Sequence, residues 1–235
     1  MVICHHEHAS KYLIAKSEIC GLKGSKNLAF ARELAYLGFA TMAVDAIGFE
    51  ERNKLKKNWW GVEYHEHASR IIQGKTLLEK NLSDLSAAVD YVCSRKEIDS
   101  SKIAFIGHSY GGRMAIIFPA FDKRIKVSVS NCFARKLKNS LDINAKTRIP
   151  MELAIPNILK YGDLDSFLKL SNKSNILLSV TKDDKWSQDA KEIYLSCKKY
   201  FKKKNLTLKI WPGNHKFTKK MKDYCYKYIK EKISN

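Results

Sequence analysis

The sequence has few of the residues that break regular structure or cross-link a small fold. Four prolines and eleven glycines among 235 residues exclude a collagen-like or low-complexity chain. The six cysteines are scattered without a Cys-x-x-Cys pair, so we expect neither a disulfide framework nor a structural zinc site. Hydrophobic residues make up 45% of the chain, which suffices for the core of a single domain over residues 1–235.

Long apolar runs are absent as well. No stretch approaches the roughly 18 apolar residues of a membrane span. The first residues, Met1 to His6, have neither the basic start nor the apolar core of a signal peptide. We therefore expect a cytoplasmic protein without a membrane partner.

Acidic residues are scarce, with 24 Asp and Glu against 43 Lys and Arg and a net charge of +19. Such a balance is compatible with nucleic-acid binding. However, thirteen lysines and only two acids lie between residues 198 and 235, where the pattern is helical. A lysine-rich helix is usually a solvated face, so we do not favour a nucleic-acid partner.

Short β-branched runs alternate with longer helical patterns along the chain. Strands are expected at residues 1–4, 39–44, 102–107, 125–129, 175–180 and 206–211, and helices at 26–37, 76–92, 189–203 and 217–233. This alternation predicts an α/β fold with about six mostly parallel strands flanked by helices. The segment around Trp59 and Trp60 is expected to be a long polar loop, and residues 132–172 an insertion that shapes a pocket.

The sharpest motif is Gly-His-Ser-Tyr-Gly at residues 107–111. It lies between an expected strand and an expected helix of small residues. A serine on such a strained turn is exposed at the carboxyl end of its strand, and glycines are needed because their neighbours approach closely. Ser109 is therefore the candidate nucleophile.

A serine nucleophile needs a histidine base and a carboxylate that orients the histidine. After the expected strand at 175–180 come two adjacent carboxylates, Asp183 and Asp184. After the last expected strand comes a turn, Pro212 to His215. The order Ser, Asp, His, each after a separate strand, is typical of the α/β-hydrolase fold.

Over nearly its whole length the chain resembles the α/β-hydrolases of the dienelactone hydrolase and prolyl-oligopeptidase-like esterase group. The resemblance depends on five stretches: residues 2–11, 45–52, 107–111, the acid and Pro-Gly-x-His loops, and residues 155–163, which are similar to acetyl-xylan-esterase-like relatives. It implies a serine esterase that needs no cofactor. Compared with the usual eight strands, the sequence begins at what resembles the third, which leaves a sheet edge that a second copy could cover.

The resemblance also implies roles for individual residues. Ser109 would be the nucleophile and His215 the base. The family places the acid three residues after a strand-end glycine, and an ungapped alignment puts Val180 at that position, which favours Asp183, with Asp184 as the alternative.

The oxyanion hole would use the backbone N–H of Tyr110 and that of Glu7 or His6. At His6, His8 and Ala9 relatives usually carry glycine, so the sequence departs from the family in this loop. Two histidine-rich stretches, residues 5–8 and 65–67, lack the His-Glu-x-x-His spacing of a metal site, and no metal is expected at either.

The residues thus predict a serine hydrolase that cleaves small carboxylic esters through an acyl-enzyme. The same triad would serve a peptidase or a thioesterase. A third alternative is a non-catalytic protein of the same fold whose basic C-terminal region binds anionic partners; it would bind polyanions with a steep salt dependence that Ser109→Ala leaves unchanged.

Overall fold

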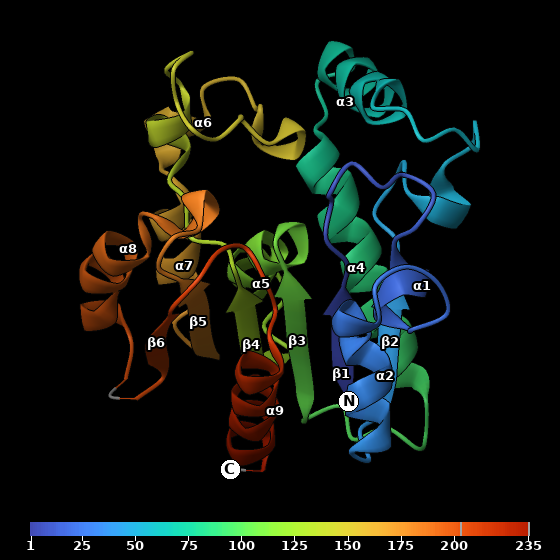
Figure 1. Ribbon diagram of the computed structural model, residues 1–235, viewed down its shortest axis with the longest axis vertical. Coiled ribbons are helices and arrows are strands. Elements are labelled where there is room, and N and C mark those ends of the chain that lie inside the picture. Colours follow the sequence, from blue (N-terminus) through green and yellow to red (C-terminus); the bar gives the residue numbers. More distant parts are fainter. Residues whose placement is uncertain (203, 235) are drawn as a thin grey trace.

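The computed structural model describes residues 1–202 and 204–234, and these residues form one fully parallel sheet (Figure 1). Its order is β2-β1-β3-β4-β5-β6. The strands are β1 (Val2–His5), β2 (Thr41–Val44), β3 (Ile103–His108), β4 (Ile125–Asn131), β5 (Asn175–Thr181) and β6 (Leu206–Trp211). The predicted α/β fold with about six parallel strands is confirmed.

Helices cover both faces of the sheet. They are α1 (Lys16–Ile19), α2 (Phe30–Tyr36), α3 (Gly61–Ile72), α4 (Leu77–Ser94), α5 (Tyr110–Phe121), α6 (Ile158–Tyr161), α7 (Leu164–Leu170), α8 (Ala190–Cys197) and α9 (Lys219–Ile233), joined in places by short 3-10 turns. Alternate strand residues point to opposite faces. Ile3 and Phe105 therefore pack in the core under α4, α5, α7 and α8, whereas Cys4 and Ile106 pack in the core under α2 and α9.

One segment differs from the sequence prediction. The expected polar loop after residue 58 contains a helix, α3. The helix buries Val62 and Glu63 in its first turn, and the Glu63 carboxylate accepts hydrogen bonds from His8 and Tyr12. Although most of α3 is partly exposed, its apolar residues gather on one side of the helix, a periodic signal that the prediction of a loop missed.

Two long segments lie beyond the carboxyl ends of the strands. Figure 1 shows α3 on one side and α6 on the other, above the arrowheads of the sheet. The second segment is residues 132–174, which connect β4 to β5 and carry α6, α7 and two 3-10 turns. Any site at this end of the sheet is therefore flanked by α3 and by the 132–174 segment.

The sheet ends in β2 on one side and in β6 on the other. A second copy that covers an edge strand stays a prediction. No helix in residues 1–202 and 204–234 combines the length and the apolar content of a membrane span.

Candidate active site

Ser109 lies at the sharp turn between β3 and α5. Its backbone has φ 57° and ψ −110°, a strained conformation for a residue with a side chain. The turn is held on both sides, because Ser109 N donates to Asn131 O at 2.9 Å and Ser109 O accepts from Arg113 N at 2.9 Å. The surroundings thus fix a strained serine, half-buried, at the carboxyl end of the central strand.

Glycine is required on either side of this turn. A Cβ at Gly111 would lie 2.2 Å from His5 O, and one at Gly107 would lie 2.2 Å from Gly111 C. Both obstructing atoms belong to backbone, which cannot rotate away. The glycines therefore let the first turn of α5 pack directly against β3 and against the end of β1.

Replacing Gly111 with Ala is expected to destabilise the fold by about 1–3 kcal/mol or more, as overpacking does. Gly74→Ala measures backbone strain alone, because Gly74 has φ 71° and nothing within 4 Å of its added Cβ. Urea unfolding monitored by circular dichroism measures both free energies. Because Gly111 has no positive φ, a loss there below about 0.5 kcal/mol would show that its backbone contact is not tight.

The loop after β1 is tied to this turn through backbone and histidine side chains. Gly111 N donates to His6 O at 3.0 Å. His6 Nε2 accepts from Ala46 N at 3.0 Å, and so Nδ1 carries the proton and donates to Glu7 O at 2.7 Å. The structure thus brings His6 and Glu7, two of the residues expected at the oxyanion hole, next to the third, Tyr110.

His8 stabilises the next part of the same loop, where Ala9 and Ser10 adopt φ values of 41° and 55°. His8 Nδ1 accepts from Ser10 N at 3.0 Å, and its Nε2 lies 2.7 Å from Glu63 Oε2. These bonds hold a conformation that glycine would adopt at no steric cost. The hydrogen bonds of the His8 side chain thus support positive φ values at two residues that carry a side chain.

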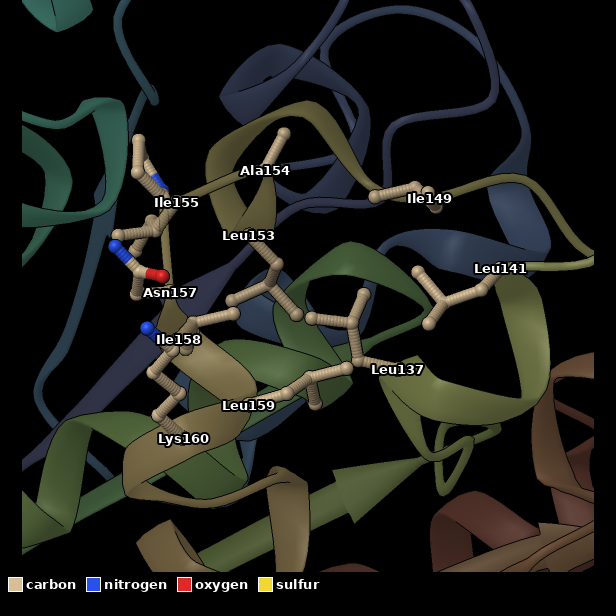
Figure 2. A pocket seen from close by; sticks show the side chains of 11 residues that line it. Leu137, Leu141, Ile149, Leu153, Ala154, Ile155, Asn157, Ile158, Leu159 and Lys160 are labelled. Atoms are coloured by element: carbon tan, nitrogen blue, oxygen red, sulfur yellow. The ribbon is translucent and has the colours of Figure 1, made fainter.

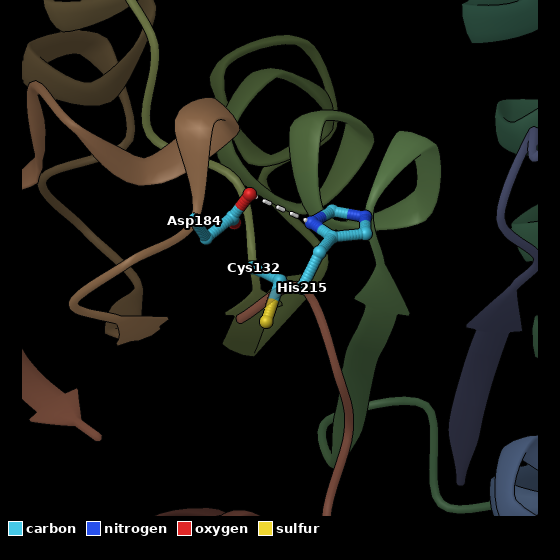
Figure 3. Close-up of side chains that lie close together, drawn as sticks. All are labelled: Cys132, Asp184 and His215. Atoms are coloured by element: carbon cyan, nitrogen blue, oxygen red, sulfur yellow. Dashed lines mark ion pairs between the residues drawn. The ribbon is translucent and has the colours of Figure 1, made fainter. Parts of the chain in front are cut away.

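His215 and Asp184 face each other across the loops that follow β6 and β5. His215 Nδ1 lies 3.0 Å from Asp184 Oδ1, with the histidine side chain about 30% exposed and the aspartate fully buried. Asp184 also accepts from Trp186 N at 2.9 Å and from Ser187 Oγ at 2.6 Å. These bonds fix the carboxylate beside His215 Nδ1 as an ion pair (Figure 3), but the pair does not have the geometry of a hydrogen bond.

The structure places Asp184, the alternative, rather than the favoured Asp183 beside the histidine. Asp183 is exposed, and its N–H donates to Gly213 O at 3.1 Å. The reason is the length of β5, which extends through Thr181, one residue past the expected end at Val180. The third residue after the strand is therefore Asp184, the residue beside His215.

His108 links the serine turn to His215. The two imidazole rings have centroids 4.9 Å apart, and His108 Nδ1 accepts from Asn131 Nδ2 at 2.7 Å. Burial, followed by the nearby His215 and Lys11, lowers the pKa of His108 well below its usual range. A neutral His108 beside His215 adds no positive charge that would oppose protonation of His215.

Lowering the pH from 7 to 5 is expected to destabilise the protein. Burial lowers the pKa of His5, His6 and His108, so these groups take up protons less readily in the folded protein than in the unfolded chain, where they titrate near pH 6.5. The stability that these histidines contribute is fully present above that pH. It is lost as the pH falls, by up to about 1.4 kcal/mol per pH unit for each histidine.

Urea unfolding at pH 7, 6 and 5 measures this loss above the range in which carboxylates titrate. The exposed His65 provides the control, because His65→Gln should leave the slope unchanged. A free energy of unfolding that stays constant from pH 7 to 5 would contradict the lowered pKa of the three buried histidines.

Sequence reasoning did not place Cys132 at this site. Its Sγ, one imidazole nitrogen of His215 and one Asp184 carboxylate oxygen all lie within 4.8 Å of one another, and Figure 3 shows the three side chains. Cys132 directly follows β4, the neighbour of β5. Because parallel strands end at the same edge, this place follows once the order β4-β5-β6 of the sheet is known.

An apolar pocket of about 470 Å³ lies within the 132–174 segment. Leu137, Leu153 and Ile158 are among its lining residues, and their side chains converge in Figure 2. Next to Leu153, Glu152 forms a buried ion pair with Arg113 of α5. The pocket segment is thereby anchored one helical turn from Ser109.

Comparisons with known proteins agree with this architecture. The sequence model of the dienelactone hydrolase family matches residues 5–233. A Bacillus subtilis protein named "Putative hydrolase YtaP" is 33% identical over 132 residues, which are 56% of this chain and 42% of that protein. The chain thus spans less than half the length of this relative.

Among solved structures, "Methylesterase BT1017" superposes with a TM-score of 0.68 at 18% identity, over 99% of this chain and 48% of that one. A glucuronoyl esterase from Solibacter usitatus superposes with a TM-score of 0.68 at 15% identity, over 98% of this chain and 73% of that one. Both likenesses establish the fold.

Proposed function

Since the chain belongs to the dienelactone hydrolase family, we propose that it is a serine hydrolase that cleaves carboxylic esters through an acyl-enzyme. The strongest support comes from two parts of the site that are held in place at the carboxyl end of the sheet. A strained Ser109 begins α5, and His215 is held beside Asp184 while its ring lies against that of His108, the residue before the serine.

In the proposed reaction, Ser109 Oγ attacks the ester carbonyl carbon while His215 Nε2 takes the hydroxyl proton. Asp184 faces Nδ1 and stabilises the imidazolium that forms. The carbonyl oxygen becomes an oxyanion, which the backbone N–H groups of Tyr110 and of Glu7 or His6 would bind. The alcohol then leaves with the proton from His215. Water reverses these steps and releases the acid and the free serine.

The ester is proposed to carry an apolar group. The pocket within the 132–174 segment is lined mostly by Leu and Ile side chains and is anchored to α5 through the pair of Arg113 and Glu152. Pockets of a few hundred Å³ with apolar walls take small organic groups. The related structures named as a methylesterase and a glucuronoyl esterase favour an ester over the peptide or thioester that the same residues could cleave.

A p-nitrophenyl ester series from acetyl to octanoyl tests this proposal. Wild type should turn over, Ser109→Ala should lose at least about 10⁴-fold in kcat because the nucleophile is gone, and Ser101→Ala, at an exposed serine, should match wild type. Turnover that survives in Ser109→Ala would contradict the assignment of the nucleophile. A folded wild-type protein without turnover of any ester would contradict the activity.

We also propose a cytoplasmic location. All six cysteines are free thiols and most are buried, as is usual in a reducing compartment. Localisation of a fluorescent fusion in the source cell tests this, and a secreted or surface signal would contradict it.

A further inference from the structure

Three soft or ionisable side chains converge where three adjacent strands end. Cys132 follows β4, Asp184 follows β5 and His215 follows β6, and their ligand atoms all lie within 4.8 Å of one another. Among the residues that the structure describes, this is the group that offers three potential metal ligands. Within the described residues, neither histidine-rich stretch, 5–8 or 65–67, forms such a group.

The spacing is close to that of a tetrahedral zinc site. Zn²⁺ binds Cys sulfur at about 2.3 Å and His nitrogen or carboxylate oxygen at about 2.0 Å, so neighbouring ligand atoms lie roughly 3.3–3.6 Å apart. His215 Nδ1 and Asp184 Oδ1, now 3.0 Å apart, would separate slightly. The sulfur lies within 4.8 Å of the other two ligand atoms, so it would approach them by about 1.2 Å or less.

A second observation concerns the nitrogen that would bind the ion. His215 Nδ1 is buried and has no hydrogen-bond partner, because the direction to Asp184 is out of line despite the short distance. The Cys132 thiol lies 3.4 Å from Lys216 O and 3.7 Å from Thr181 Oγ1, both weak hydrogen bonds of sulfur, and Cys132 itself has φ 53°. A polar nitrogen and a sulfur are thus held beside a carboxylate without strong partners of their own.

We propose that Cys132, Asp184 and His215 form a Zn²⁺ site whose occupation switches the hydrolase off. Water would take the fourth position. On binding, the S–H bond of Cys132 breaks, its proton goes to solvent and a Zn–S bond forms, while the carboxylate and the imidazole each supply a lone pair. Two negative ligands balance the charge of the ion.

Inhibition follows from the tautomer that the metal selects, and this half of the inference rests on the proposed function. An imidazole that binds Zn²⁺ through Nδ1 carries its proton on Nε2. That nitrogen is the one that must accept the proton of Ser109. A metal-bound His215 therefore cannot act as the base, and Asp184 is withdrawn from it at the same time.

Metal binding is tested without reference to activity by adding Co²⁺ to the purified protein. Wild type should give the near-ultraviolet band of a thiolate-to-Co²⁺ charge transfer and should lose it on addition of one equivalent of Zn²⁺. Cys132→Ser should lack the band. Cys225→Ser is the matched control and should keep it, because Cys225 is an equally buried thiol outside the group.

The inhibitory half is tested by the rate at which a fluorophosphonate probe labels each protein, relative to its own metal-free rate. Zn²⁺ should slow the labelling of wild type, and a chelator should restore its rate. Cys132→Ser or Cys132→Ala should need at least about tenfold more Zn²⁺ for the same slowing, since even outer-shell changes at zinc sites cost 10–100-fold in affinity. Equal sensitivity of wild type and these variants would overturn the proposal, as would a Co²⁺ band that persists without Cys132. If wild type does not label at all, the Co²⁺ result alone decides the site.

Discussion

Asp184→Asn is expected to lower kcat for ester hydrolysis about 10⁴-fold while the fold stays intact. Asp184 is fully buried and lies 3.0 Å from His215 Nδ1. An amide would favour the wrong tautomer of the imidazole and would not stabilise its charged form, which is the effect of this exchange in serine proteases. Steady-state kinetics with a p-nitrophenyl ester measure the loss.

Asp183→Asn is the matched control, because it makes the same change one residue away. Asp183 is exposed and only its backbone N–H bonds to the histidine loop, so kcat should stay within a few-fold of wild type. A large loss in Asp183→Asn with little effect in Asp184→Asn would contradict the assignment of Asp184 as the acid. It would instead identify Asp183, the residue that sequence spacing favoured.

Glu152→Gln or Arg113→Met is expected to cost about 3–5 kcal/mol of folding free energy, because each leaves an unpaired buried charge. The two side chains form an ion pair and are almost inaccessible to solvent. The Arg113 guanidinium also lies 4.9 Å from the ring centre of Tyr110 and 4.8 Å from that of Phe133. Urea unfolding monitored by tryptophan fluorescence gives the free energies.

Two further variants make this result specific. The double variant Arg113→Met, Glu152→Leu removes both charges and should recover much of the loss. Asp223→Asn, which breaks the exposed pair with Lys219, should change stability by less than about 1 kcal/mol. A single variant at Arg113 or Glu152 that costs no more than Asp223→Asn would show that the pair does not anchor the 132–174 segment.

The sheet could be predicted from sequence because burial on two faces imposes continuous apolar runs. Residues 103–106 and 176–178 are entirely buried, and such runs bounded by turns are clear signals. The serine turn was equally clear, since Gly107 and Gly111 are demanded by backbone contacts that no other residue permits. Features that are constrained within one strand or turn can therefore be predicted from the sequence.

The features that the sequence prediction missed depend on contacts between residues that are distant in the chain. Helix α3 is stabilised by Glu63, which bonds to His8 and Tyr12 more than fifty residues earlier. The choice between Asp183 and Asp184 depended on whether β5 ends at Val180 or at Thr181, and a boundary is uncertain by more than that. The place of Cys132 beside His215 follows from the sheet order, which adjacent residues do not encode.

The most direct test of the central claim is fluorophosphonate labelling of the purified protein followed by mass spectrometry of its peptides. The account predicts a single phosphonylated residue, Ser109, with labelling lost in Ser109→Ala and strongly reduced in His215→Ala, while Ser101→Ala labels like wild type. Labelling of another residue, or a folded wild-type protein that does not react, would contradict the assignment of Ser109, His215 and Asp184 as a catalytic triad.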